Sequence, residues 1–417
     1  MEFKYTSIYE WGIYLIIFLN LGFLNIFSGF SKNIVFLTAI IAVVLVLIYF
    51  TQGEKNRNIL DLILKINIFC IILIYFLNIL KFLSSNNFSS SVGTAIAGES
   101  GWLLLLISFP FAVVLSRGNS NFLRNIAYLG LAILVLKFIV WFLYNYFSIL
   151  LAPGYFRLGL GWQRAVGSKM LTRMDGTFLD PFTFFYFYFK FKNSNVLKEK
   201  VISALVLCFI LGYEYFVYQS RSTILYLIMA VIIGELFLLL KSENKIQSLI
   251  LFFLVILILF IIFKDQIFSF VSTFDPTNTQ NSYSSSSMAR IYEINYFKNL
   301  WQSGNSWLGF GLINDQTFIG GMTFYLSDIG ILAYLFEYGY IGFFIFVFPL
   351  ILGFICIIVK KINKFNLIDS ILIMLLIYLV ISQVNLNMYW FNQATLLPIC
   401  LGLLLYFNKV SSYTDDL

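Results

Sequence analysis

The chain has 417 residues, of which 60% are hydrophobic and only 11% carry a charged side chain. Ordinary soluble domains are roughly a quarter charged, so this composition excludes a soluble globular protein. The net charge of +7 comes from basic residues interspersed with apolar segments. It therefore does not indicate nucleic-acid binding, which requires a basic patch on one face of a domain.

The chemistry open to the chain is restricted by what it lacks. Histidine is absent, which removes the usual general base and the commonest transition-metal ligand. All cysteines lie inside apolar runs, so we expect neither a disulfide framework nor a zinc site; they are Cys70, Cys208, Cys356 and Cys400. We accordingly predict no metal and no cofactor.

Long apolar runs predict membrane-spanning helices. Runs such as 34–50, 125–152 and 329–358 approach or exceed the ~20 residues that cross a bilayer core, and backbone groups in lipid must pair within their own segment. The predicted fold class is an all-α polytopic membrane protein, with a single transmembrane domain over 1–417. We place about twelve spans at 11–30, 34–50, 59–83, 101–116, 125–152, 177–191, 201–219, 221–240, 246–263, 328–358, 367–385 and 393–407.

The distribution of lysine and arginine predicts the orientation of these spans. With the N-terminus in the cytoplasm, most basic residues of the short loops fall on the cytoplasmic side, as the positive-inside rule requires. Four segments then lie outside the membrane: 84–100, 153–176, Gln219–Ser220 and 264–327.

The segment 264–327 is predicted to be a large extracytoplasmic loop before the tenth helix. Its first part is rich in Ser, Thr and Asn and has no periodicity. A surface helix is expected near 288–303, with Ser287 as its cap; its apolar positions are Ile291, Ile294, Phe297, Leu300 and Trp301. Gly309 and Gly311 then permit a close turn before the chain re-enters the membrane.

Arginines on the predicted outer face run against the positive-inside rule. Arg157, Arg164 and Lys169 are interpreted as solvated loop charges or lipid-facing anchors. Arg173 and Arg221 have more specific surroundings, because each stands close to the expected start of a helix that runs from outside to inside.

In the first of these helices, Asp180 is expected to cap a helix that begins at Pro181; in the second, Ser220 occupies the cap position before Arg221. The positive ends of these helix dipoles favour an anion, and guanidinium groups bind phosphate with two donors each. Arg290 on the loop helix is expected to close over such a site. For Arg221, pairing with Glu214 or with a lipid phosphate is the alternative.

Few carboxylates are candidates for acid–base chemistry. Asp328, at the predicted outer end of the tenth helix, is either a helix cap or a weak base that orients an attacking hydroxyl, because a helix N-terminus favours its ionised form. Glu293 and Asp315 are the next candidates. We predict paired structural roles for the remaining intramembrane charges, namely Asp61 with Lys65, Glu235 and Asp369.

Several short blocks between about 170 and 342 resemble, in their order, the bacterial O-antigen polymerase and O-antigen ligase superfamily (Wzy and WaaL). The topology, with one large external loop before the tenth helix, is also similar to that family. The blocks are Arg173-Met-Asp-Gly-Thr-Phe-Leu-Asp180-Pro181, Ser220-Arg221-Ser222, Arg290 with Trp301, Trp307-Leu-Gly-Phe-Gly311, Ser327-Asp328 and Glu337-Tyr-Gly339-Tyr-Ile-Gly342.

The resemblance implies a C-type glycosyltransferase-like membrane enzyme that uses a glycan linked to undecaprenyl pyrophosphate, without metal or nucleotide sugar. It implies that Arg173, Arg221 and Arg290 bind the pyrophosphate while an acceptor hydroxyl attacks the anomeric carbon with inversion. Ligases of the family have a histidine where this chain has Ser327-Asp328, which counts against a ligase.

The predicted function is therefore polymerisation of a surface polysaccharide, such as O-antigen of lipopolysaccharide or capsule, at the extracytoplasmic face of the bacterial cytoplasmic membrane. The expected partners are undecaprenyl-pyrophosphate-linked oligosaccharides and, as a further candidate, a chain-length regulator protein. The alternatives are an O-antigen-ligase-like transferase and a flippase or transporter of lipid-linked oligosaccharides.

Overall fold

The computed structural model of the chain describes residues 2–26, 31–52, 59–84, 100–118, 120–156, 163–166, 169–240, 284–311, 316–319, 322–359, 366–384 and 396–414, together with Ile246, Lys264 and Phe268. The described part is almost entirely helical, as the sequence predicts. Its few strands form two short antiparallel hairpins.

The elements described in the first part of the chain, as far as residue 155, are all helices. They are α1 (Glu2–Asn20), η1 (Phe23–Ile26), α2 (Ser31–Thr51), α3 (Ile59–Ser84), η2 (Ser100–Ile107), α5 (Ser108–Ser116), α6 (Ser120–Phe147) and η3 (Pro153–Tyr155).

The rest of the chain adds the hairpins and the remaining helices. The strands are β1 (Gln163–Val166) with β2 (Lys169–Thr172) and β3 (Gln316–Ile319) with β4 (Met322–Tyr325). The helices are α7 (Asp180–Asn193), α8 (Leu197–Gly212), η5 (Tyr213–Tyr218), α9 (Arg221–Leu240), α11 (Ser284–Ser303), η6 (Leu326–Ile329), α12 (Ile331–Val359), α13 (Leu367–Ser382) and α14 (Leu396–Thr414).

Six of the described helices are long and apolar enough to cross a membrane, within α2, α3, α6, α8 continued by η5, α9 and α12. Shorter apolar helices occupy Gly101–Ser116, Leu367–Ser382 and Leu396–Asn408. The chain is thus a helical membrane protein, and this part of the prediction is confirmed. The predicted span 246–263 lies outside the described residues except for Ile246, so the count of about twelve crossings stays a prediction.

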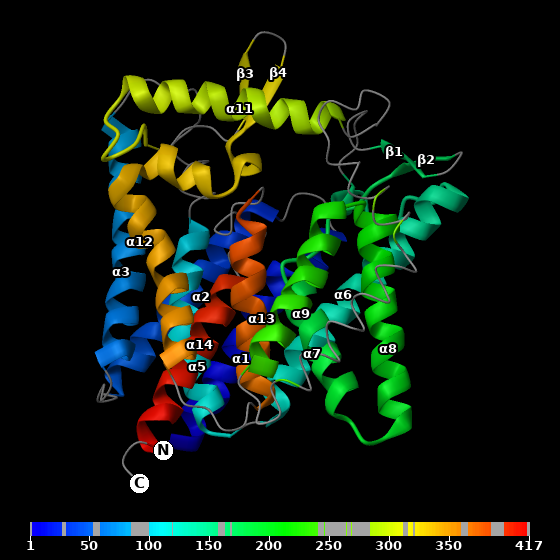
Figure 1. The fold of residues 1–417 in the computed structure, drawn as a ribbon, viewed down its shortest axis with the longest axis vertical. Helices are drawn as coiled ribbons and strands as arrows, with labels where there is room; N and C mark the ends of the chain where they lie inside the picture. The colour runs from blue at the N-terminus through cyan, green and yellow to red at the C-terminus, as the bar shows by residue number, and fades with distance from the viewer. Residues whose placement is uncertain are drawn as a thin grey trace.

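The helices pack side by side into a bundle whose two ends differ (Figure 1). Helix α11 lies across one end, and both hairpins lie at that same end; the two chain termini lie at the other (Figure 1). Along α3, buried side chains such as Leu64 and Ile68 alternate with exposed apolar ones such as Leu62, Ile66 and Leu73. An outward apolar face of this kind suits contact with lipid.

The charged groups inside the bundle have the paired roles predicted for them. Asp61 and Lys65 form an ion pair of 2.7 Å, and Glu235 pairs with Lys192 at 2.6 Å. Asp369 closes a capping box at the start of α13. Each pair removes the cost of leaving an isolated charge in an apolar environment.

The predicted surface helix is longer than the sequence suggested. It begins at Ser284 rather than near 288, so Ser287 lies inside the helix and the prediction that it is the cap is wrong. The run of four serines, 284–287, resembles coil in composition because serine has a weak helix propensity, yet it forms the first turn of α11.

One face of α11 packs on the start of α12. Phe297 and Trp301 are buried there, as predicted, whereas Ile291 and Leu300 remain largely exposed. The apolar cluster that holds α11 in place consists of Phe297, Trp301, Leu326, Ile329, Ala333 and Phe336. It joins the surface helix to η6 and α12.

Helix α12 is interrupted at Gly339, where φ is 67° and ψ is −170°. The segment 306–311 pairs with this break through backbone hydrogen bonds, which use groups that the helix leaves unpaired. These bonds are Phe310 N–H to Phe336 O (3.0 Å), Gly311 N–H to Glu337 O (2.9 Å), Tyr340 N–H to Ser306 O (3.1 Å) and Ile341 N–H to Trp307 O (3.3 Å). The segment 306–311 and the segment around Gly339, which are separate in the sequence, thus form one structural unit.

The close approach requires glycine on both sides. Gly309 has φ of 67°, and a Cβ atom there would lie 2.3 Å from the carbonyl oxygen of Glu337. A Cβ atom at Gly339 would lie equally close, 2.3 Å, to the carbonyl oxygen of Trp307. Neither contact can be relieved by rotating a side chain, because both partners are backbone atoms.

We predict that Gly309→Ala destabilises the protein, since a positive φ costs a non-glycine residue about 1–3 kcal/mol even before the clash with the backbone. The measurement is the thermal unfolding of detergent-solubilised protein, with size-exclusion chromatography reporting how much folded protein remains after heating. Gly304→Ala is the matched control, because the nearest atom to its added Cβ is 3.6 Å away. Equal stability of the two variants would contradict the proposed role of the break.

Candidate functional site

The segment 172–180, which links β2 to α7, is held against α6 by a buried lysine. The Nζ atom of Lys137 donates hydrogen bonds to the carbonyl oxygens of Asp175 and Gly176, both at 3.1 Å. It also lies over the ring of Tyr155, 5.7 Å from the centroid. Burial raises the pKa of Tyr155 to about 12, so this ring stays neutral and acts as a cation–π partner.

Further along α6, two more side chains hold the beginning of the same segment. Asn145 accepts a hydrogen bond from Thr172 N–H at 2.8 Å and donates to Thr172 O at 3.1 Å. Trp141 Nε1 also donates to Thr172 O, at 2.9 Å. Both backbone groups of Thr172 are therefore satisfied by side chains of α6.

The opposite side of the segment is held by η5, a π-helical turn that continues α8. Tyr213 donates from its hydroxyl to Asp175 O at 3.0 Å, and Met174 N–H donates to Val217 O at 3.0 Å. The turn ends at Gln219, whose φ of 56° is left-handed. π-Helical turns are rare and occur frequently at functional sites.

Asp180 does not have the predicted role of helix cap. Helix α7 starts without a side-chain cap, and the Asp180 carboxylate turns back to accept hydrogen bonds from Thr177 N–H (2.6 Å) and from the Thr177 hydroxyl. Gly176 leaves room for it, because a Cβ atom there would lie 2.7 Å from Asp180 Oδ2. The carboxylate therefore faces the 172–180 segment and not the helix that it begins.

The buried carboxyl groups of Asp180 and Glu214 lie close enough for each to influence the ionisation of the other. Glu214 is 0% exposed, and neither of its carboxylate oxygens has a hydrogen-bond donor among the described residues. The alternative expectation that Arg221 pairs with Glu214 is therefore wrong. Two neighbouring buried carboxyl groups disfavour each other's ionised form.

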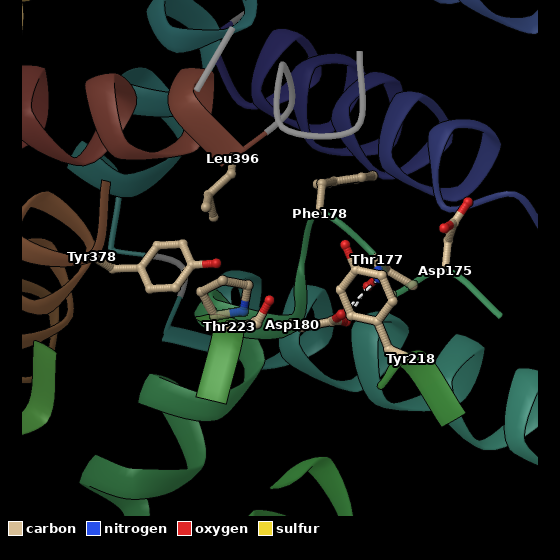
Figure 2. Close-up of a pocket in the computed structure, with 10 residues that line it drawn as sticks. Asp175, Thr177, Phe178, Asp180, Tyr218, Thr223, Tyr378 and Leu396 are labelled. Carbon is tan, nitrogen blue, oxygen red and sulfur yellow. Dashed lines mark hydrogen bonds between the residues drawn. The ribbon is translucent and has the colours of Figure 1, made fainter. Parts of the chain in front are cut away.

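A small pocket opens beside Asp180 (Figure 2). Its volume of about 40 Å³ exceeds the ~15 Å³ that a water molecule needs. It is lined by Asp175, Gly176, Thr177, Phe178, Asp180, Pro181, Tyr218, Thr223, Tyr378 and Leu396. The lining thus combines carboxylates, hydroxyl groups and aromatic rings from separate parts of the chain.

One of the predicted arginines contacts a residue of this pocket, and a second begins a helix that lines it. The Arg173 guanidinium lies over the ring of Tyr218, 5.5 Å from its centroid, and Tyr218 lines the pocket. Arg221 is the first residue of α9. As predicted, Ser220 caps this helix, since its hydroxyl accepts from Thr223 N–H at 3.4 Å and lies 2.7 Å from the Thr223 hydroxyl. Thr223 also lines the pocket.

Arg290 reaches the same region from α11. Its guanidinium lies within electrostatic range of the Tyr226 hydroxyl on α9, and Tyr226 in turn lies within range of Tyr378. The Nε atom of Arg290 is buried and has no hydrogen-bond acceptor among the residues that the structure describes. A buried guanidinium N–H without an acceptor is a ready donor for an anion.

Asp328 lies elsewhere. It belongs to η6, and Gly330 with φ of 60° separates this turn from α12, which begins at Ile331. Asp328 is therefore not at the cap position that the sequence suggested, and it is not among the residues that line the pocket. Glu293 is buried on α11, and Asp315 lies outside the described residues. Arg157 also lies outside the described residues. The side chains of Arg164 and Lys169 are not described either.

Sequence reasoning missed the buried members of this site. Lys137 interrupts the apolar run LAILVLKFIVW, and Glu214 falls inside the predicted span 201–219. An ionisable residue within a span is by default a candidate for function, and this signal would have singled out both. The pairing of Glu214 with Asp180 leaves no local signal, because it depends on how α8 packs beside α7.

Comparison with family models, with characterised proteins and with solved structures finds no match to this chain.

We predict that Lys137→Met loosens the 172–180 segment, because hydrogen bonds to a charged donor each contribute about 1.5–3 kcal/mol. The measurement is hydrogen–deuterium exchange of the solubilised protein, where exchange in 172–180 should accelerate about tenfold or more. Lys192→Met is the control, since Lys192 pairs with Glu235 on a different part of the bundle. Unchanged exchange in Lys137→Met would show that other contacts suffice.

Proposed function

We propose that the chain is a membrane glycosyltransferase that polymerises a surface polysaccharide from repeat units linked to undecaprenyl pyrophosphate. The reaction transfers a growing glycan from its lipid pyrophosphate to a hydroxyl group of another lipid-linked repeat unit, with inversion and without a metal. The donor and acceptor are both lipid-linked, which fits a site at one end of a membrane-embedded helical bundle.

The observation that supports this function is the position of Arg173 over Tyr218, which lines the pocket. Arg221 begins the helix whose Thr223 also lines it, and the proposal adds Arg290 from α11 as the third phosphate ligand. Cleavage of a sugar–phosphate bond builds negative charge on the leaving pyrophosphate. Fixed guanidinium groups stabilise that charge more than they stabilise the ground state, and this difference lowers the barrier. The beginnings of α7 and α9 add the positive ends of two helix dipoles.

The proposed topology has about twelve crossings with the N-terminus in the cytoplasm. The end of the bundle that carries α11 and both hairpins (Figure 1) is then extracytoplasmic. The excess of basic residues in the short loops supports this orientation. It puts the pocket where lipid-linked repeat units would be joined, at the outer face of the cytoplasmic membrane.

Deletion of the gene in the organism that encodes the chain tests the function, with the surface glycan separated by gel electrophoresis and the lipid-linked glycans extracted. Loss of a polymerase leaves single repeat units on the surface or on the lipid. Loss of a ligase would leave long chains on undecaprenyl pyrophosphate, and loss of a flippase would leave single units on the cytoplasmic side. Normal surface chains would refute all three.

We predict that Arg221→Lys reduces chain formation about tenfold or more while the amount of membrane-inserted protein stays normal. Lysine keeps the charge but cannot present the planar pair of donors that binds a phosphate. The deletion strain complemented with each variant is assayed for chain length and for protein in the membrane.

Arg124→Lys provides the control for this substitution, because Arg124 lies ~20 Å along α6 from Lys137 at 1.5 Å per residue. Full-length chains from Arg221→Lys at the wild-type rate would contradict a bidentate phosphate contact. Arg221→Ala should be more severely impaired than Arg221→Lys, because it loses the charge as well.

A further inference from the structure

The reaction proposed above needs a group that removes the proton of the attacking hydroxyl. We infer that the pocket binds the attacking sugar and that Asp180 takes this proton, while Glu214 holds the proton that the carboxyl pair already shares. The inference rests on the proposed function. It replaces Asp328 as the proton acceptor by a residue that the sequence had assigned to a helix cap.

The surroundings of the two carboxyl groups distinguish their roles. Asp180 accepts hydrogen bonds from the backbone N–H and the hydroxyl of Thr177, and such donors favour the ionised form. Glu214 has no donor among the described residues and is 0% exposed, which favours the protonated form. The asymmetric donor set therefore favours the negative charge on Asp180 and the protonated form of Glu214.

Asp180 is also the member of the pair that reaches a ligand. It lines the pocket, whereas Glu214 is not among the lining residues. A carboxylate that is ionised, oriented by two fixed donors and in contact with the pocket has the properties of a general base. A neutral Glu214 beside it leaves a single negative charge in the pair, and that charge lies on the group that faces the ligand.

A second feature of the pocket points to a hydroxyl-rich ligand. Tyr378 is only 2% exposed, and its hydroxyl points into the pocket (Figure 2). A tyrosine hydroxyl can both donate and accept a hydrogen bond. A ligand that both donates and accepts hydrogen bonds would satisfy it.

The remaining lining residues suit the same class of ligand. Asp175 and Thr223 add further polar groups, while Phe178 and Tyr218 offer aromatic rings. Carboxylates bind sugar hydroxyl groups, and aromatic rings pack against the apolar C–H face of a sugar ring. Binding pockets commonly combine a few convergent polar groups with such apolar surface. The group that enters the pocket is therefore a hydroxyl-bearing edge of the acceptor sugar, since a pocket of about 40 Å³ admits only part of the ring.

The proposed step conserves atoms and charge. The acceptor oxygen forms a bond to the anomeric carbon of the donor glycan, and the bond from that carbon to the phosphate oxygen breaks. The electron pair of the broken bond stays on undecaprenyl pyrophosphate, whose charge the arginines stabilise. The hydroxyl proton moves to Asp180, so that both carboxyl groups of the pair are neutral until the proton leaves to solvent.

The experiment compares Asp180→Asn with Glu214→Gln in the deletion strain. Asparagine cannot accept the proton, and loss of a general base lowers a rate by about 10²–10⁴-fold, so single repeat units should accumulate. Glu214→Gln keeps a neutral group at the position of the protonated acid, so we expect it to impair chain formation less than Asp180→Asn does.

Glu235→Gln is the matched control, since it removes a buried carboxylate of α9 that pairs with Lys192 instead of lining the pocket. Asp328→Asn is assayed beside it and should retain chain formation. The inference is overturned if Asp180→Asn forms chains at the wild-type rate, or if Glu214→Gln is inactive while Asp180→Asn is active.

Tyr378→Phe keeps the experiment decisive if Asp180→Asn fails to accumulate in the membrane. It removes only a hydroxyl group without a described partner, so folding should be unaffected, while chain formation should fall about tenfold through a higher KM for the acceptor, the loss expected for one hydrogen bond. Unchanged chain formation would exclude the pocket as the sugar site. The variants are compared in a deletion strain in which the wild-type gene restores chain formation. Failure of the wild-type gene to restore chains would contradict the proposed function itself, not only the role of the pocket.

Discussion

The arrangement of the site depends on one buried cation. Lys137 sits in the middle of an apolar helix, where an uncompensated ammonium group would be costly. The carbonyl oxygens of Asp175 and Gly176 compensate it at 3.1 Å each, and this requirement fixes the path of the chain between β2 and α7. Since Arg173 and Asp180 flank those carbonyl groups, the position of both side chains follows from the burial of one lysine.

A second constraint acts on the end of the bundle above the site. The break of α12 at Gly339 frees backbone groups that cannot remain unpaired, and the segment around Gly309 pairs with them. The same pairing, together with the packing of Phe297 and Trp301 of α11 against α12, holds α11 across the bundle. Arg290 is thereby presented toward Tyr226 from a segment that begins far away in the sequence.

The proposed reaction would give the cations and the carboxylates of this region different parts. The arginines would stabilise the charge of the leaving phosphate, and the carboxyl pair would accept the proton of the attacking hydroxyl. By holding a proton, Asp180 and Glu214 carry less negative charge together than two separate carboxylates would. Two ionised carboxylates would compete strongly with a phosphate for the arginines. A pair that carries one negative charge competes less.

The sequence by itself determined the membrane character of the chain, most helix positions, the loop helix, the cap at Ser220 and the choice of Arg173, Arg221 and Arg290 as candidates. These features follow from composition, periodicity and residues adjacent along the chain, which are local quantities. The tertiary structure alone decided that Asp180 turns away from its helix, that Glu214 joins it and that Lys137 holds the segment between them. Each of these depends on which helices lie side by side, and the burial of a polar group selects its partner only after that packing is fixed.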